Sequence, residues 1–239
     1  MKLRLLAAAA ILTLCADATV THAQTIGSYR HLVLDGHALK WGEPVLGTGA
    51  TVTFALVETG TRFSGTRNCS SMAPLDDLLS RNAIGAATFL RELDAALNAW
   101  EAAADISFSS ADPAVADILI GAQAKPRGYA FANVEYDETA PGEGPRTISR
   151  SLVCFNPLKP WKVGYDGDLE IYDLRYTLMH EIGHAIGLNH PLATGQLMSH
   201  KYNEAYRVLQ TGDIGGAESL YGPAPIRVGD FRQGQVGVN

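Results

Sequence analysis

Two histidines and a glutamate stand close together at residues 180 to 184, where the sequence reads His-Glu-Ile-Gly-His. On a helix, positions four residues apart lie one above the other, so His180 and His184 would present their imidazoles to the same point. Glu181 leaves the same turn about 100° away around the helix axis. This spacing predicts a metal ion held by the two histidines, with a carboxylate that flanks the ion without binding it.

The residues that follow can supply a third ligand. Gly187 can adopt a left-handed conformation without steric cost, which ends a helix and turns the chain. His190, three residues later, can then return to the metal as a third nitrogen ligand. Three imidazoles leave one tetrahedral position open, which is typical of a catalytic zinc site. The alternative is a glutamate as third ligand, Glu204 or Glu218, with His190 unused; the Gly187 turn favours the histidine.

The complete pattern, H-E-x-x-H-x-x-G-x-x-H, resembles the zinc-binding motif of the metzincin endopeptidases, whose members place a methionine turn beneath the metal. Met198 follows His190 by eight residues, which is a suitable spacing. The segment 213–222, which ends in Leu-Tyr-Gly, resembles the closing helix of the matrixin branch. With weaker matches upstream, the resemblance covers residues 38–222 and is similar to the short, secreted bacterial members of that branch.

The resemblance implies a zinc-dependent endopeptidase that hydrolyses internal bonds of protein or peptide substrates. In such a site the metal lowers the pKa of a bound water to about 7. Glu181 would act as general base and then pass the proton to the leaving amine. Met198 would pack under the zinc ligands rather than bind the metal. The alternative function is a catalytically silent zinc-binding module of the same fold, and the intact Glu181 favours the enzyme.

Two residues just beyond Met198 are candidates for contact with the substrate. His200 lies two positions after the methionine, where some related metzincin branches carry a tyrosine that stabilises the oxyanion. We therefore consider an oxyanion or substrate role for His200, against the alternative of an exposed loop histidine. Tyr202 is a second candidate, as a wall residue of the substrate pocket.

The matrixin resemblance also implies a structural zinc and a calcium, held by a His-Phe-Asp sequence and by a glutamate that precedes a tryptophan. In this chain the corresponding residues are Cys154, Phe155 and Asn156, with Lys159 in place of the glutamate. We therefore expect one catalytic zinc and no structural zinc. The acidic loop 137–145 is interpreted as a solvated loop rather than as a calcium site.

Two cysteines, Cys69 and Cys154, remain once the N-terminal leader described below is removed. An even pair in an exported protein suggests one disulfide. The alternative is that the thiolate of Cys69 plugs the metal site, as in latent members of the family. The sequence at 67–70, Arg-Asn-Cys-Ser, does not match the Pro-Arg-Cys-Gly of those members. We therefore favour the disulfide.

The N-terminus has the pattern of a secretory signal peptide. A basic start is followed by an apolar run from Leu5 to Leu14, which is too short to span a membrane. Acceptable cleavage sites follow at Ala18 and Ala23. We therefore expect residues 1–23 to be removed and the protein to be secreted or periplasmic, with no transmembrane span.

Removal of this leader takes away two of the 19 basic residues and one of the 25 acidic residues, which leaves a net charge of −7. Such a charge argues against nucleic acid and anionic membranes as partners. The remaining chain divides into an N-terminal extension (24–37), one catalytic domain (38–222) and a polar, glycine-rich tail (223–239). We expect the protein to be a monomer.

Hydrophobic periodicity predicts the elements that must position these residues. Residues 80–104 carry an apolar stripe at helical spacing, and a second helix is predicted at 174–188 with Asp173 as its N-cap. Short strands are predicted at 51–57, 105–108, 118–120, 129–134 and 148–155. A long helix and an active-site helix amid several strands predict an α+β fold. The resemblance adds that the sheet is twisted and mixed, and that a small C-terminal subdomain contains the methionine turn and the last helix.

Overall fold

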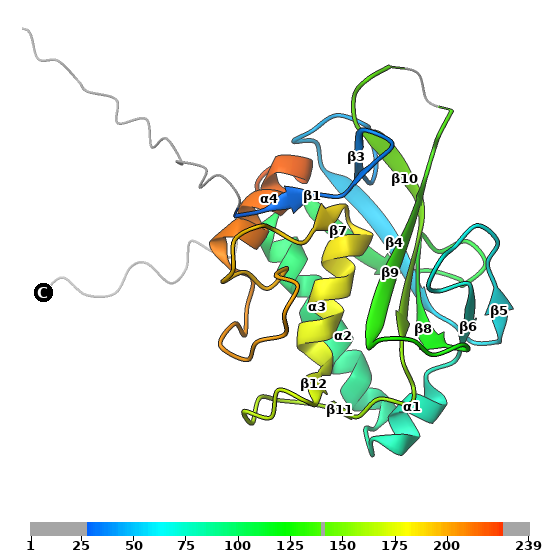
Figure 1. Cartoon of the computed structure of the whole chain (residues 1–239). Helices are drawn as coiled ribbons and strands as arrows, with labels where there is room; N and C mark the ends of the chain where they lie inside the picture. The colour runs from blue at the N-terminus through cyan, green and yellow to red at the C-terminus, as the bar shows by residue number, and fades with distance from the viewer. Residues whose placement is uncertain (1–27, 140–141, 227–239) are drawn as a thin grey trace, which may run out of the picture.

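The structure is a computed structural model that describes residues 28–139 and 142–226 (Figure 1). The predicted signal peptide, 1–23, lies outside the described residues. The first four residues of the predicted extension and residues 227–239 of the predicted tail also lie outside them. The described residues form the predicted α+β fold, in which a mixed sheet packs against helices.

A nine-stranded mixed sheet forms one layer of the fold. Its strands are β2 (Val33–Leu34), β3 (His37–Lys40), β4 (Ala50–Leu56), β5 (Thr61–Arg62), β6 (Ser71–Ala73), β7 (Ile106–Ser110), β8 (Ile118–Gln123), β9 (Ala130–Tyr136) and β10 (Arg146–Phe155). The parallel part has the order β3-β10-β8-β4-β7. The antiparallel pairs are β2 with β3, β5 with β6, β6 with β8 and β9 with β10.

Burial distinguishes the centre of this sheet from its edge at β9. All six residues of β8 are buried, as is the C-terminal half of β10, because both strands are covered on both faces. β9 pairs with the edge of β10 opposite β8 and is partly exposed along its whole length. The sheet therefore presents β9 as an edge strand toward the active-site helix, α3 (Leu174–Ala185), which it contacts.

The long helix α2 (Ala86–Ala103) packs beside α3 against the sheet (Figure 1). The apolar stripe of α2 is buried, as predicted, and the indole N–H of Trp100 donates to the carbonyl of Met179 in α3 at 3.0 Å. This contact fixes the two helices relative to each other. Within the described residues, no helix is both long enough and apolar enough to cross a membrane.

The helix predicted at 80–104 begins later in the structure, at Ala86, and residues 80–81 are instead the end of a separate short helix, α1 (Asp76–Arg81). Ala83 has a φ of +52°, a left-handed conformation that stops α1. Asn82 lies at this break, where its side-chain amide donates to Leu78 (2.8 Å) and its amide oxygen accepts from the backbone N–H of Trp161 (2.8 Å). The break is thus stabilised by a contact with a residue 79 positions away, which helical periodicity could not reveal.

The catalytic-motif helix α3 begins as predicted and ends earlier than predicted. Asp173 is its N-cap, and its carboxylate accepts from the backbone N–H of Tyr176 at 2.8 Å. The helix ends at Ala185 rather than at residue 188, because Gly187 has a φ of +101°. The two residues after that turn form the short strand β13 (Leu188–Asn189).

The N-terminal strand β1 (Arg30–His31) pairs antiparallel with β13. The next residue, Leu32, donates its backbone N–H to the carbonyl of Gly187 at 2.7 Å. From the other side, Tyr221 at the end of α4 (Thr211–Tyr221) donates its hydroxyl to the carbonyl of Ile186 at 2.6 Å. Residues within the predicted N-terminal extension therefore pack on the domain and hold the turn that precedes His190.

A disulfide joins Cys69 to Cys154, with an S–S distance of 2.03 Å and a Cα–Cα distance of 5.8 Å. It ties the segment that carries β5 and β6 to β10. Both cysteines are fully buried in a small hydrophobic cluster that is separate from the main core. The disulfide thus stabilises the part of the sheet next to β9, because Cys154 lies on β10, the strand that pairs with β9.

Candidate metal centre

Three imidazoles meet at one point beside α3. The Nε2 atom of His190 lies 3.1 Å from Nε2 of His180 and 3.2 Å from Nε2 of His184. In the part of the chain that the structure describes, these residues are the one group of at least three histidine, cysteine or acidic side chains whose ligand atoms all lie within 4.8 Å of one another. Neither Glu204 nor Glu218 belongs to this group, which favours His190 as the third member.

Backbone carbonyls determine which nitrogen of each helical imidazole faces that point. His180 Nδ1 lies 3.0 Å from the carbonyl oxygen of Leu197, and His184 Nδ1 lies 2.9 Å from that of Leu188. A carbonyl oxygen only accepts, so each Nδ1 carries the proton and each Nε2 presents a lone pair. The two helical rings are therefore oriented as metal ligands, with their second nitrogens held by the protein.

The protonation state of the triad suits a cation. Burial lowers the pKa of His180 and His190 to about 4 and that of His184 to about 3, so all three rings are neutral at pH 7. Neutral imidazole is the form that binds metal. The Nε2 lone pairs of His180 and His184 both point at Nε2 of His190, at 3.1 and 3.2 Å, and a cation shared by the three rings satisfies all of these nitrogens. The donor set therefore fits Zn²⁺, which is commonly bound by histidine nitrogen.

The methionine turn lies under this group. Asp213, which is buried at the start of α4, accepts hydrogen bonds from the backbone N–H groups of Leu197 (2.8 Å) and Met198 (3.0 Å). The side chain of Met198 packs against Gly183, between the two helical histidines. Asp213 therefore holds both the methionine and the Leu197 carbonyl that orients His180.

Glu181 is buried beside the triad. Its side chain lines the same cleft as the three histidines. Burial raises the pKa of Glu181 to about 8, and a hydrogen bond with the backbone of Ala132 on β9 opposes this rise. Burial thus favours the protonated form of the Glu181 carboxyl, and a cation bound at the triad would favour its charged form.

The triad opens into a cleft of about 650 Å³ between β9 and α3. Leu32 and Leu34 of the N-terminal segment contribute to its lining. His200 also lines it, and its ring lies 4.8 Å from that of His190 in an edge-to-face arrangement. Tyr202 is a buried wall residue of the same cleft. The three predicted metal ligands, Glu181 and the two candidate substrate residues thus line one cavity, whereas Met198 is buried against Gly183.

Sequence reasoning missed several residues of this cleft. Tyr129 and Tyr172 line it and stack on each other, with ring centroids 3.9 Å apart. Tyr129 lies immediately before β9, and Tyr172 belongs to β12 (Tyr172–Asp173), a strand that pairs in parallel with β11 (Trp161–Lys162). Leu32 and Leu34 belong to the segment assigned to the extension. No local pattern marked these residues as parts of a site, because only the packing of distant segments brings them together.

Comparisons with known proteins agree with the geometry of the site. The matrixin family model matches residues 78–222, which is more than half of the chain and includes all three histidines. Human matrix metalloproteinase-20 is 29% identical over 152 residues, which cover 58% of this chain and 29% of that protein. Stromelysin-1 of the horse, Equus caballus, is 31% identical over 150 residues, which cover 56% of this chain and 28% of that protein. The chain spans less than a third of the length of these relatives. The match extends over the helix, the glycine turn and the methionine turn that build the triad, and the chain therefore belongs to the matrixin family.

Proposed function

We propose that this protein is a zinc-dependent endopeptidase that hydrolyses internal peptide bonds. His180, His184 and His190 would hold one catalytic Zn²⁺, and Glu181 would act as general base. The observation that carries this proposal is the convergence of three imidazoles on one point in the lining of the cleft, with a buried carboxyl group beside them. Family membership supports the same class of reaction.

Each residue has a distinct part in this mechanism. When bound, Zn²⁺ supplies a Lewis acid that polarises the peptide carbonyl and makes water a nucleophile at neutral pH. The carbonyls of Leu197 and Leu188 keep the imidazoles of His180 and His184 in the ligand orientation. Glu181 accepts a proton from the attacking water and delivers it to the leaving amine.

The edge strand β9 supports an extended peptide as the substrate. Among the described residues β9 pairs only with β10, and residues 128–134 line the cleft. A peptide laid along this free edge can hydrogen-bond to its backbone as an added strand, which places a peptide bond near Glu181. The substrate is therefore a protein or a peptide rather than a small compact molecule.

His200 is the candidate for a further contact with the reacting carbonyl or the substrate. It lies at the cleft beside His190, within reach of a group bound at the triad. A His200→Ala variant should lower kcat by about tenfold or more if this imidazole stabilises the oxyanion. A variant whose turnover equals that of the wild type would show that His200 has no part in the reaction and is an ordinary exposed loop histidine.

Several parts of the proposal concern the whole chain. Residues 1–23 would be a signal peptide, which makes the mature protein secreted or periplasmic. The catalytic domain would occupy residues 38–222, with one zinc, no structural zinc and a monomeric state. N-terminal sequencing of the exported protein would test the leader, with Ala18 and Ala23 as the alternative cleavage positions.

The decisive experiment is a digest of casein and of mixed peptides by the purified, zinc-loaded mature protein. Glu181→Gln should lower the rate by about 10²–10⁴-fold while zinc stays bound. Glu58→Gln, which changes an exposed carboxylate, is the matched control. A chelator should abolish cleavage and added zinc should restore it. Zinc binding without any cleavage by the wild type would instead assign the chain as a catalytically silent module.

A further inference from the structure

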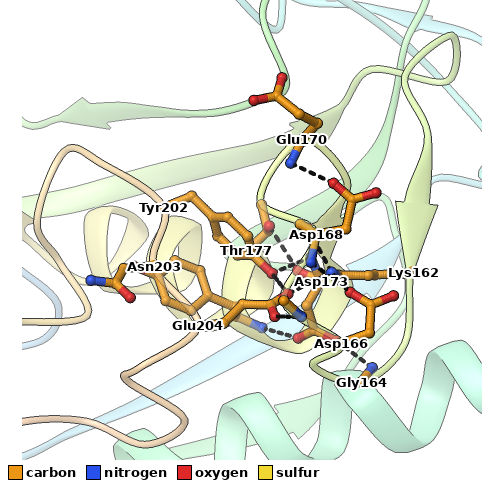
Figure 2. A network of polar contacts seen from close by, with 12 residues as sticks. Lys162, Gly164, Asp166, Asp168, Glu170, Asp173, Thr177, Tyr202, Asn203 and Glu204 are labelled. Carbon is orange, nitrogen blue, oxygen red and sulfur yellow. Dashed lines mark hydrogen bonds and ion pairs between the residues drawn. The ribbon is translucent and has the colours of Figure 1, made fainter.

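Lys162 makes polar contacts both with the loop 164–170 and with Glu204, which lies in the segment after the methionine turn (Figure 2). Its ammonium nitrogen lies 2.6 Å from Oε1 of Glu204 and donates to the carbonyl of Asp168 at 2.7 Å. It also forms an ion pair with Asp166. One positive charge is therefore shared between carboxylates from two loops.

The Lys162–Glu204 ion pair is shielded from solvent. The side chains of Lys162 and Glu204 are 12% and 8% exposed, whereas those of the Arg150–Glu135 ion pair on β10 and β9 are 37% and 31% exposed. Screening by water weakens an exposed pair far more than a shielded one. Removal of Lys162 would leave a shielded carboxylate without its counter-charge, close to the carboxylate of Asp166.

Glu204 also binds Tyr202, a tyrosine that lines the cleft. Its Oε1 accepts the hydroxyl of Tyr202 at 2.8 Å, and its Oε2 accepts the backbone N–H of Gly167 at 2.6 Å. The Tyr202 hydroxyl in turn accepts the backbone N–H of Asp173, the N-cap of α3, at 3.1 Å. The phenol is thus held at its polar end between Glu204 and the first turn of the active-site helix.

The ring of Tyr202 is part of an aromatic wall. It stacks on Tyr172 with centroids 4.3 Å apart, and Tyr172 stacks on Tyr129 at 3.9 Å. Tyr176 meets the Tyr202 ring edge-on at 4.8 Å. All four rings line the cleft that contains the histidine triad. A shift of Tyr202 would therefore alter the shape of the apolar surface that faces a bound peptide.

We propose that Lys162 and Glu204 are positioning residues for substrate selection, which hold Tyr202 so that the aromatic wall receives an apolar side chain of the peptide. This inference rests on the proposed endopeptidase function, because it requires a peptide in the cleft. Neither residue touches the substrate. Each acts through Tyr202, by the hydrogen bond that Glu204 accepts and by the charge that Lys162 supplies to Glu204.

The kinetic test uses two fluorogenic peptides that differ only in one residue beside the cleaved bond, leucine or alanine. In Lys162→Met and in Glu204→Ala the ratio of kcat/KM for the two peptides should fall about tenfold, through a higher KM for the leucine peptide. Lys162→Arg should keep the ratio within about threefold of the wild type, because the charge is retained. Arg150→Met, which breaks the exposed ion pair, should leave the ratio unchanged. An equal loss of kcat/KM for both peptides would indicate a merely structural role.

A second measurement does not depend on catalysis. The amide N–H groups of Gly167 and Asp173 donate to Glu204 and Tyr202, so their hydrogen exchange should accelerate about tenfold or more in Lys162→Met and Glu204→Ala, but not in Arg150→Met. If the hydrogen exchange of these amides is unchanged, or if the variants are active with an unchanged ratio of kcat/KM for the two peptides, the positioning role is wrong. The proposed endopeptidase function is unaffected by either result. Cleavage of neither peptide by the zinc-loaded wild type overturns the proposed function, and substrate selection with it.

Discussion

The side chain of Met198 fills the space beside the Cα atom of Gly183, in the middle of the zinc-motif helix. A Cβ atom built on Gly183 would overlap the Met198 sulfur and would lie 2.8 Å from Cζ2 of Trp100. Glycine at this position therefore has a packing role, since it allows the methionine turn to approach the helix between His180 and His184. The fit links the floor of the site to the long helix α2.

Gly183→Ala should therefore destabilise the protein even though alanine is the better helix former. Overpacking of the contact with Met198 and Trp100 should lower the free energy of unfolding by about 1–3 kcal/mol. The same change should weaken zinc binding, because the helix and the methionine turn must separate. Thermal unfolding and zinc titration measure the two effects.

Gly215 offers a matched control in α4. A Cβ there would meet only Tyr29, at an ordinary distance of 3.8 Å. Gly215→Ala should therefore stabilise the protein by about 0.5–1 kcal/mol, the usual preference for alanine over glycine within a helix. Equal effects of the two substitutions would contradict the packing role of Gly183.

Zinc content should depend on the three imidazoles of the triad and not on the fourth imidazole nearby. His184→Asn should reduce the metal from about one zinc per chain to less than about 0.1, because two ligands bind zinc far more weakly than three. His200→Ala should retain about one zinc per chain, since His200 does not belong to the converging group. Metal analysis after dialysis measures both, and loss of zinc from the His200 variant would require a different ligand set.

The buried Lys40 predicts a rise in stability at alkaline pH. Its ammonium group donates to the carbonyls of Trp41 (2.7 Å) and Glu43 (2.6 Å), and burial lowers its pKa from 10.5 to about 8. Between these two pH values the unfolded chain holds a proton that the folded protein has released, so stability increases with pH across this window. Below pH 8 both states are protonated and the contribution of Lys40 stays at its lowest.

The comparison with Lys40→Met isolates this contribution. Between pH 7.5 and pH 10 the free energy of unfolding of the wild type should rise by about 1–3 kcal/mol relative to that of the variant. Denaturant unfolding of both proteins at each pH gives the difference, in which the titration of tyrosines remote from Lys40 cancels. A constant difference across this range would show that Lys40 keeps its ordinary pKa in the folded protein.

The disulfide should contribute to stability but not to metal binding. It closes a sequence separation of 85 residues, and Cys69→Ala combined with Cys154→Ala should lower the free energy of unfolding by about 2–4 kcal/mol. Zinc content should be unchanged, because neither cysteine belongs to the triad. A reductant should lower the melting temperature of the wild type but not that of the double variant. Loss of zinc on substitution of Cys69 would instead favour its role as a thiolate ligand.

Local sequence patterns were sufficient for the elements that carry the chemistry. The spacing of His180 and His184 on one helix, the cap at Asp173 and the turn at Gly187 each depend on interactions within a few residues. The apolar stripe of α2 is local in the same sense, and the strands with β-branched or apolar runs were located to within a few residues. Short-range periodicity encodes such features directly.

Tertiary structure alone decided how distant segments complete the site. The break between α1 and α2 depends on Asn82 and Trp161, and the wall of the cleft depends on Tyr129, Tyr172 and Tyr202 from three separate segments. The pairing of β1 with β13 and the Lys162–Glu204 ion pair likewise join residues far apart in the chain. The physical reason is that such contacts depend on strand register and loop packing across the whole fold, which local hydrophobic patterns do not specify.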